Sequence, residues 1–359
     1  MAENDLESVR KKVEELDIKI VELIDKRAEL AKKAGEAKKS EGIEVYDASR
    51  EAEVMANVAG HAKIMPKEDV KSIYREIISA SRGIQASLKI AYFGPKTTFT
   101  HMAAIKEFGN AADYIAYDSI AEVFENVEKG NADLGVVPVE NSTEGTVNHT
   151  LDMFINSNLG IKGEISIPVI HNLLSNSTIS DVKKLYSHPQ AIAQCRKWIS
   201  KNLPKVEIIE TSSTTKGAES ATVYHSSAAI ASRLAAEEFG LKIVAENISD
   251  LANNFTRFLV IGKGDGNNAT GKDKTSIMFS VKHEAGALFN ALKPLHDNNV
   301  NMTKIESRPT RAKSWEYVFF VDVQGFRDDA KIQKTIAEMQ KSCGFIKILG
   351  SYPEKATGE

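Results

Sequence analysis

Cysteine is scarce in this sequence, since only Cys195 and Cys343 occur among 359 residues. They lie far apart and outside metal-ligand spacing, so the sequence predicts two free, partly buried thiols and neither a disulfide framework nor a zinc site. Long apolar runs are missing as well, because no stretch approaches the ~18 residues of a membrane span. Residues 1–8 are acidic where a signal peptide would be basic and then apolar. These absences predict a cytoplasmic protein without a membrane partner.

A strong charge of either sign is also absent. The formal net charge is only −3, which does not favour the basic surface that a nucleic-acid partner would require. Hydrophobic residues make up 42% and charged residues 26% of the chain, as is typical of a soluble globular protein. A chain of this length predicts two or three domains, each with its own core.

One short stretch combines several groups that recognise an anion. Residues 253–258 read Asn-Asn-Phe-Thr-Arg-Phe and lead into a predicted apolar strand that ends at Gly262. Two amides and a guanidinium can hold a carboxylate by charge-assisted hydrogen bonds, while the hydroxyl of Thr256 can donate a proton. A β-forming threonine beside a solvated arginine explains the same residues, and this stretch alone does not decide between the two interpretations.

The start of the chain carries a heptad pattern. Apolar residues recur at steps of three and four from Leu6 to Leu23, which predicts a long helix that needs a partner helix. Arg27 occupies the next seam position, where an unpaired charge would be costly to bury. Lys38 shares its face, because eleven steps of ~100° come within ~20° of three turns. Arg10 faces ~100° away from Arg27, so we expect it to serve a site formed with another chain.

Two further helices are predicted in the first 87 residues. Gly42 interrupts the first helix, Asp47 can cap a second, and Pro66 begins a third that runs to about Ala86. Taken singly, the polar residues of these helices fit a solvated charged surface. Taken together, eight of them resemble, in order and spacing, the active-site pattern of the all-helical chorismate mutases. The eight are Arg10, Arg27, Lys38, Asp47, Arg50, Glu51, Ser81 and Gln85.

That resemblance implies an intertwined homodimer that rearranges chorismate to prephenate. The step is pericyclic, so positioning and electrostatics must supply the rate, and neither a cofactor nor a metal is implied. By the resemblance, Arg27 and Arg10 of the partner subunit hold the two carboxylates. Lys38 and Gln85 donate to the ether oxygen as negative charge develops on it, and Glu51 accepts the ring hydroxyl.

The pattern changes at Leu88 to alternating strands and helices, which predicts an α/β fold. Strands are expected at 89–93, 134–139 and 206–209, and helices at 119–129 and 191–202. Hydroxyl-rich segments follow strands, at the edge where α/β sheets bind ligands; they lie at 98–100, 140–145, 211–214 and Thr256. Serine, threonine and asparagine are also common turn and helix-cap residues, so each segment alone has a second explanation.

In order, these segments resemble the complete prephenate dehydratase module. The matching motifs are Gly-Pro-Lys at 94–96, Phe-Thr-His at 99–101, Val-Pro-Val-Glu-Asn-Ser at 137–142, Tyr-Ser-His-Pro-Gln at 186–190, Ser-Thr at 213–214, and residues 253–258. One departure is Thr97, where many relatives carry glycine. The resemblance implies two lobes, similar to periplasmic binding proteins, with the chain crossing to the second lobe near Ile165 and returning near Val244.

The resemblance also implies that prephenate loses carbon dioxide and its ring hydroxyl together, giving phenylpyruvate. Thr256 is the candidate proton donor to the leaving hydroxyl. Orienting or binding roles are implied for Thr98, Glu140, Asn141, Ser142, Ser213, Thr214, Arg257 and Phe258. His101 and His188 titrate in a suitable range, but we expect them to be turn or binding residues.

The last part of the chain follows a polar, Gly-rich linker at residues 264–271 and shows a βαββαβ pattern. Strands are expected at 275–281, 300–306, 315–323 and 346–349, and helices at 286–297 and 329–341. Two motifs resemble the phenylalanine-binding ACT domain: Gly286, Ala287 and Leu288 at a helix start, and Glu306, Ser307, Arg308 and Pro309 after a strand. Without these motifs, a generic ferredoxin-like dimerisation domain would explain the same order of elements.

Together the three regions resemble a bifunctional chorismate mutase and prephenate dehydratase of phenylalanine biosynthesis, with an ACT domain through which L-phenylalanine inhibits. The expected fold is multidomain, with an all-α domain at 1–87, a two-lobed α/β domain at 88–264 and an α+β domain at 275–353. A homodimer or a tetramer is expected. A ligand-binding protein without chemistry, or a scaffold that keeps the helical dimer only for assembly, are the alternatives, and turnover of chorismate separates them from an enzyme.

Overall fold

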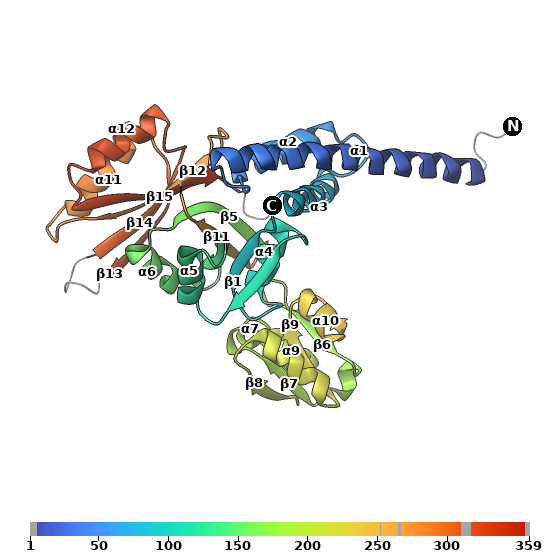
Figure 1. Ribbon diagram of the computed structural model, residues 1–359. Helices are drawn as coiled ribbons and strands as arrows, with labels where there is room; N and C mark the ends of the chain where they lie inside the picture. Colours follow the sequence, from blue (N-terminus) through green and yellow to red (C-terminus); the bar gives the residue numbers. More distant parts are fainter. Residues whose placement is uncertain (1–5, 252, 265–266, 310–316, 356–359) are drawn as a thin grey trace. The chain divides into compact units, whose positions relative to one another are not determined.

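The computed structural model describes residues 6–251, 253–264, 267–309 and 317–355. The chain divides into two compact units, whose elements are labelled in Figure 1. The first unit holds residues 1–88 and 108–113, and the second holds residues 89–107 and 114–359.

The first unit is built on three helices, α1 (Leu6–Glu41), α2 (Ala48–His61) and α3 (Lys67–Gln85). Both α1 and α2 pack on α3. The three predicted helices are confirmed. α1 ends just before Gly42, whose φ of +69° is readily adopted by glycine. Asp47 caps α2, because its side chain accepts a hydrogen bond from the backbone N–H of Arg50 at 2.9 Å.

The apolar stripe of α1 is exposed in the single chain. Val13, Leu16 and Ile20 are 49%, 56% and 52% exposed, and no residue of α1 is buried. Apolar area in contact with water costs about 25 cal/mol per Å². A continuous apolar row on a helix therefore marks an interaction surface.

The second unit begins with a six-stranded sheet in the order β2-β1-β3-β11-β5, with β4 paired to β3. β1 and β3 run parallel, whereas β11 runs antiparallel to both β3 and β5. The strands are β1 (Lys89–Phe93), β2 (Asp113–Tyr117), β3 (Leu134–Asn141), β4 (Gly145–Thr146), β5 (Gly160–Pro168) and β11 (Phe255–Gly262). The helices of this part are α4 (Phe99–Phe108), α5 (Ile120–Lys129) and α6 (Asn148–Asn156). α5 and α6 bury Phe124 and Phe154 against the sheet in one apolar core.

The ladder between β3 and β11 contains a bulge. Arg257 lies opposite Glu140, but the next residue, Phe258, lies opposite Pro138. The extra residue on β3 is Val139, beside a proline that has no N–H to donate to the ladder. The bulge therefore sets the last residues of β3 against the first residues of β11.

The chain then forms a five-stranded sheet in the order β10-β6-β9-β7-β8. Its strands are β6 (Asn172–Ser175), β7 (Lys184–Ser187), β8 (Glu207–Glu210), β9 (Ser227–Ala231) and β10 (Lys242–Ala245). Its helices are the 3-10 helix η1 (Ile179–Asp181), α7 (Pro189–Gln194), α8 (Arg196–Asn202), α9 (Thr214–Val223) and α10 (Arg233–Phe239).

One sequence prediction needs correction in this region, and the structure locates the two crossings between the sheets. The chain crosses from the first sheet to the second through residues 169–171, after Ile165, because β5 continues to Pro168. It returns through residues 246–254, because β10 continues past Val244. The single helix predicted at 191–202 is two short helices, since Cys195 between them has a non-helical ψ of 13°.

The C-terminal part is a four-stranded antiparallel sheet in the order β13-β14-β12-β15, which confirms the βαββαβ prediction. Its elements are β12 (Asp273–Ser280), α11 (Ala287–Asp297), β13 (Met302–Pro309), β14 (Tyr317–Gln324), α12 (Ala330–Met339) and β15 (Phe345–Pro353). α11 and α12 lie side by side and share a core with β12 and β14 (Figure 1). Residues 265–266 of the predicted linker and 315–316 of the predicted third strand lie outside the described residues.

The C-terminal sheet meets the first sheet through backbone atoms. β15 lies next to β5, and a Cβ built on Gly350 would be 2.1 Å from the carbonyl oxygen of Ile161. No side chain fits in that gap, so the close approach of the two strands requires glycine.

Candidate active sites

The first cluster of polar side chains forms where β3 ends beside the start of β11. Thr256 lies opposite Asn141 in the ladder, and Asn141 Nδ2 donates to Thr256 Oγ1 at 2.8 Å. The same amide nitrogen donates to Asn254 Oδ1 at 2.9 Å. All three side chains are buried. The structure therefore brings the predicted proton donor together with one of the predicted binding residues.

The hydrogen bonds that Oδ1 accepts fix the orientation of the Asn141 amide. Asn141 Oδ1 accepts hydrogen bonds from Thr143 N at 3.0 Å, from Thr143 Oγ1 at 2.6 Å and from Glu144 N at 3.2 Å. An amide oxygen that accepts from three donors leaves the NH₂ group directed at Thr256. Because Thr256 Oγ1 accepts from Asn141, the hydroxyl proton is available for another acceptor.

Two residues that sequence reasoning missed extend this cluster. Gln194 Oε1 accepts from Asn254 Nδ2 at 3.1 Å and lies 2.8 Å from His171 Nε2. Because Oε1 is an acceptor, His171 donates through Nε2, and burial lowers the pKa of its imidazole. No local motif marks either residue, although Gln194 lies at the end of α7, which begins in the Tyr-Ser-His-Pro-Gln segment.

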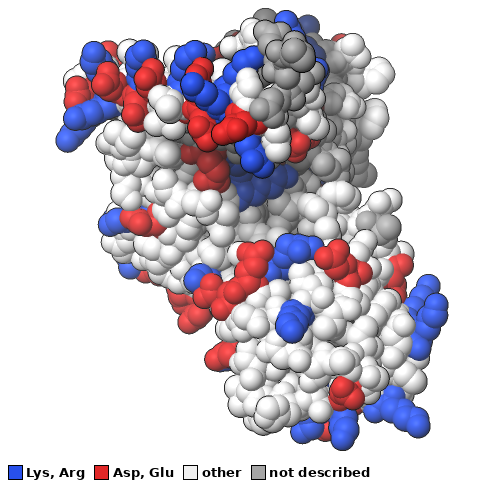
Figure 2. Space-filling model, turned by 90° about the vertical axis from the view of Figure 1, so that its right-hand side faces the viewer, with Lys and Arg blue, Asp and Glu red and all other residues white. Residues whose placement is uncertain are grey.

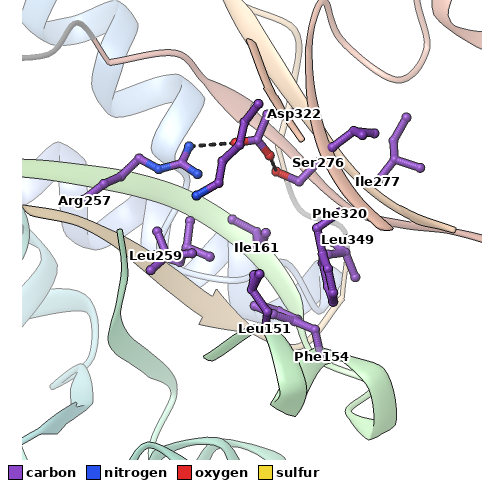
Figure 3. Close-up of a pocket in the computed structure, with 13 residues that line it drawn as sticks. Leu151, Phe154, Ile161, Arg257, Leu259, Ser276, Ile277, Phe320, Asp322 and Leu349 are labelled. Atoms are coloured by element: carbon purple, nitrogen blue, oxygen red, sulfur yellow. Dashed lines mark hydrogen bonds and ion pairs between the residues drawn. The ribbon is translucent and has the colours of Figure 1, made fainter. Parts of the chain in front are cut away.

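Glu140 and Arg257 project away from this cluster. Arg257 Nη1 lies 2.8 Å from Asp322 Oδ2 and 3.0 Å from Glu164 Oε2, and Lys304 Nζ lies 2.8 Å from Glu140 Oε2. Figure 3 shows Arg257 directed at Asp322. Burial alone would lower the pKa of the Arg257 guanidinium, but Asp322 and Glu164 raise it well above its usual range. These two predicted binding residues are therefore engaged with the C-terminal sheet.

The other predicted binding residues occupy loops and helix starts. Thr98 Oγ1 donates to Pro95 O at 2.9 Å, and Ser213 caps α9 by accepting from Lys216 N. Thr214 is the first residue of α9. Ser142 Oγ accepts from Phe255 N at 3.0 Å and so holds the turn before Thr256. Phe258 is 1% exposed, so in this structure it is a core residue.

The loop after β1 is joined to α9 through Thr97, whose φ is +69°. Its Oγ1 lies 3.0 Å from Thr215 Oγ1, and its backbone N–H donates to His101 Nδ1 at 3.1 Å. The turn thus keeps the left-handed backbone that glycine would adopt readily. His101 is buried, and that burial lowers the pKa of its imidazole to about 4. A neutral imidazole that accepts a backbone hydrogen bond fits the structural role expected for His101.

The helical unit gathers several of the predicted mutase residues where α1 faces α3. Arg27 Nη1 donates to Ser81 Oγ at 2.5 Å, and a Cβ on Gly35 would be 2.7 Å from the side chain of Gln85. Lys38 Nζ donates to Val45 O at 3.0 Å, just before α2.

Three more of the predicted residues lie on α2 or at its start. Asp47 is the helix cap, Arg50 pairs with Glu53 at 2.9 Å on the surface, and Glu51 lies 3.5 Å from Arg82. Arg10 is exposed near the other end of α1, seventeen residues and ~25 Å from Arg27 along the helix axis. It therefore cannot share a site with Arg27 of the same straight helix.

The predicted effector residues divide between α11 and β13. Gly286 caps α11 with a φ of +79°, which explains the glycine by backbone conformation. Ala287 and Leu288 form the first turn of α11. Along β13, Glu306 accepts from Thr146 Oγ1 at 2.8 Å, and Arg308 makes a bidentate pair with Asp152 at 2.8 and 3.0 Å. Ser307 and Pro309 alternate with them and are exposed.

The charged surface has no single sign on the face drawn in Figure 2, where Lys and Arg lie among Asp and Glu. Within the described residues, no helix is both long and apolar enough to span a bilayer. The same residues contain no group of three or more His, Cys, Asp or Glu side chains arranged to hold a metal ion.

Comparison with known proteins gives three family matches in chain order. Residues 9–86 match chorismate mutase type II, residues 90–266 match prephenate dehydratase, and residues 275–339 match the ACT domain. A bifunctional chorismate mutase/prephenate dehydratase of Aquifex aeolicus is 46% identical over 356 residues, covering 98% of each chain. The chain belongs to this bifunctional family. The protein of the same description from Neisseria gonorrhoeae is 41% identical and covers 96% of each chain.

A solved structure supports the fold of the dehydratase and ACT domains. Prephenate dehydratase of Arthrobacter aurescens, in complex with L-Phe, matches with a TM-score of 0.69 and 32% identity, covering 74% of this chain and 90% of that chain. The prediction of a helical mutase domain, an α/β dehydratase domain and an ACT domain is therefore confirmed. The chain is a bifunctional enzyme, an isomerase and a carbon-oxygen lyase.

Proposed function

We propose that prephenate is dehydrated at the cluster around Thr256. The observation that carries this assignment is the hydrogen bond from Asn141 to Thr256, which leaves the hydroxyl proton available. As the bond between ring and carboxylate breaks, its electron pair aromatises the ring, and the ring hydroxyl leaves with the proton of Thr256. The products are phenylpyruvate, carbon dioxide and water, and Thr256 regains a proton from solvent.

The surrounding hydroxyls supply substrate binding in this proposal. Thr98, Ser142, Ser213 and Thr214 retain some exposure, so each is accessible to prephenate. In this proposal Glu140, Arg257 and Phe258 do not contact prephenate directly, which is supported by the ion pairs of the first two and the burial of the third.

For the mutase reaction we propose a site between α1, α2 and α3. Arg27, with Ser81 beside it, holds one carboxylate of chorismate, and Lys38 with Gln85 stabilises the charge that develops on the ether oxygen. Glu51 accepts the ring hydroxyl, while Asp47 and Arg50 begin the helix that carries it. The second carboxylate is held by Arg10 of the partner subunit.

This assignment requires a homodimer. Its support is the exposed apolar stripe of α1 together with the position of Arg10, which is too far from Arg27 to serve the same site. A partner α1 laid along the stripe would cover the apolar row and deliver its arginine. We expect the protein to work in the cytoplasm, where free thiols such as Cys195 and Cys343 persist.

We also propose that L-phenylalanine binds the ACT domain and inhibits the dehydratase. The support is the dehydratase from Arthrobacter aurescens, which was solved in complex with L-Phe. In this chain α11 begins at Gly286 to Leu288, and a helix N-terminus suits a carboxylate, although the N–H of Ala287 also donates to Glu284 O at 3.2 Å. Residues 306–309 complete the predicted site, and Glu306 and Arg308 also contact the dehydratase domain.

The decisive experiment is turnover by the purified full-length chain. Given chorismate, it should form prephenate and then phenylpyruvate, and given prephenate it should form phenylpyruvate in a reaction that phenylalanine slows. A protein that binds prephenate without consuming it would be the ligand-binding alternative. A protein that assembles but leaves chorismate untouched would be the scaffold. We propose the domain boundaries 1–87, 88–264 and 275–353, which limited proteolysis followed by mass measurement would check.

A further inference from the structure

The side chains of successive residues of β11 point to opposite faces of the dehydratase sheet. The side chain of Thr256 joins the Asn141 cluster, whereas that of Arg257 reaches the ACT domain. Their partners on β3 alternate in the same way, because Asn141 turns towards Thr256 and Glu140 towards Arg257. Alternation is the rule for a strand, so these two neighbours share one backbone while contacting different domains.

Arg257 is held by a carboxylate from each domain. Asp322 belongs to β14 of the ACT domain and Glu164 belongs to β5 of the dehydratase, and both bind the same guanidinium nitrogen. Each carboxylate has a second partner, since Ser276 Oγ donates to Asp322 at 2.6 Å and Lys274 Nζ donates to Glu164 at 2.9 Å. The guanidinium, which is always charged, therefore links the two domains by ion pairs.

The same pairing argues against a substrate role for Arg257. To bind prephenate, the guanidinium would have to leave Asp322 and Glu164, and both carboxylates are almost fully buried. Glu164 would keep Lys274, but Asp322 would lose its close cation, and a buried carboxylate without its cation is strongly unfavourable.

The packing around Arg257 is not complete. Its Nε lies 3.5 Å from the nearest Glu140 oxygen, which is longer than a good hydrogen bond. A cavity of about 20 Å³ lies beside the guanidinium, between Leu259 of the dehydratase and Phe320 of the ACT domain. Figure 3 shows Leu259 and Phe320 among the side chains that line this cavity together with Arg257 and Asp322. Phe320 and Leu259 also belong to one buried apolar core, so the ACT sheet and β11 are mechanically coupled on this side.

We propose that Arg257 is a positioning residue that ties Thr256 to the ACT domain through Asp322. A displacement of β14 moves the guanidinium, the guanidinium moves the backbone of β11, and that backbone carries the Thr256 hydroxyl. The ladder to β3 is interrupted by the bulge directly after Arg257, whereas the ladder to β5 is regular from Phe255 to Val260, so Thr256 and Arg257 move together on one backbone segment. The inference rests on the proposed role of Thr256 and on the proposed inhibition by phenylalanine.

The first test separates positioning from substrate binding. Arg257→Lys keeps the positive charge but cannot bridge two carboxylates as a guanidinium does. We expect kcat for prephenate to fall by up to about 10²-fold, the cost of a small misplacement of a catalytic group. KM should stay within about threefold of the wild-type value, because a residue that does not contact prephenate leaves its binding unchanged. A raised KM at unchanged kcat would make Arg257 a substrate ligand and overturn the proposal.

The second test uses substitutions in two charged contacts between the same domains. Asp322→Asn breaks the link to Arg257, whereas Lys347→Met on β15 removes the hydrogen bond to Ser157 O, away from β11 and from the proposed effector residues. Calorimetry on the full-length proteins measures phenylalanine binding, which also reports a folded ACT domain. Activity titrations measure inhibition. We expect Asp322→Asn to bind phenylalanine but to lose the coupling, normally about 5- to 150-fold, while Lys347→Met is inhibited like the wild type.

Three outcomes would overturn the inference: wild-type inhibition of Asp322→Asn, equal loss in both variants, or no effect of Arg257→Lys. Failure of the proposed function looks different, because then wild-type turnover does not respond to phenylalanine or Thr256→Val remains fully active. If Asp322→Asn does not fold, Ser276→Ala loosens the same carboxylate by removing one hydrogen bond. That variant should weaken inhibition in the same direction, and an unchanged response would count against the proposal.

Discussion

Asn141 donates a hydrogen bond to Thr256 across the β3–β11 ladder, with 2.8 Å between Nδ2 and Oγ1. The direction of this bond is settled by three donors on the other end of the amide, which come from residues 143 and 144. Threonine is a weak acid, so a donated hydrogen bond to its oxygen is useful because it stabilises the negative charge that develops as the proton leaves. The pair therefore acts as one catalytic unit.

Replacing Thr256 by valine keeps the shape of the side chain and removes its hydroxyl. Turnover of prephenate should fall by at least about 10²-fold, the lower range for general acid catalysis. Mutase turnover of the same protein should not change. Steady-state assays with each substrate measure both effects. Unchanged kcat with a raised KM would make Thr256 a binding residue.

The substitution Asn141→Asp should be nearly as damaging, although the two side chains have the same shape. A carboxylate has no proton to donate, so the Thr256 hydroxyl would donate to it and no longer to the substrate. We expect kcat to fall by about 10²-fold. Adding Thr256→Val to Asn141→Asp should lower kcat little further, because the effects of substitutions at residues that act as a unit are not additive. If the loss in kcat of the double variant equalled the product of the two single losses, the two residues would act independently and the shared role would be contradicted.

Lys38→Ala should abolish mutase turnover while prephenate is still dehydrated. The loss of one preorganised donor to a developing charge costs about 10²–10³-fold in rate. Lys39→Ala, which removes the neighbouring exposed lysine, is the matched control and should remain active. Wild-type mutase activity in Lys38→Ala would remove Lys38 from the proposed site.

A charge in the α1 stripe should separate the subunits. Leu16→Glu lies in the stripe, whereas Ile18→Glu lies on the opposite face, because two residues turn the helix by ~200°. Both positions are exposed in the single chain, at 56% and 62%, so neither change should unfold it. Sedimentation should show a smaller assembly only for Leu16→Glu, with loss of mutase activity. A dimer that survives this change would place the interface elsewhere.

Acid should destabilise the dehydratase domain partly through His101. Its folded pKa is about 4 because of burial, below the unfolded value of about 6.5. The unfolded chain therefore takes up the proton first, so stability is full above pH ~6.5 and declines as pH falls towards about 4. His101→Asn keeps an acceptor for Thr97 and should flatten this decline in urea titrations. The exposed His225→Asn should leave it unchanged.

Local signals explain why most of the fold could be predicted. Asp47 caps α2 as expected, and Gly42 ends α1, because caps and left-handed glycines act within a few residues. The break between α7 and α8 was missed because Cys195 is neither proline nor glycine. The first crossing between the sheets was expected near Ile165 and lies a few residues later, since β5 continues to Pro168 without a composition change.

The candidate site was only partly accessible from sequence. Motif order identified Asn141 and Thr256, but Gln194 and His171 join them through contacts across tens of residues that no spacing encodes. The direction of Arg257 is a different case. It follows Thr256 on a strand, so alternation alone indicates that both side chains cannot face one small substrate.

The contact between Gly350 and Ile161 has a consequence for chimeric enzymes. The two backbones are so close that even alanine, with its single methyl group, would force β15 away from β5. An ACT domain grafted from another enzyme will seat on this dehydratase only if it brings a glycine to that position. The rest of the grafted sequence can differ, but the residue that faces Ile161 has to be glycine.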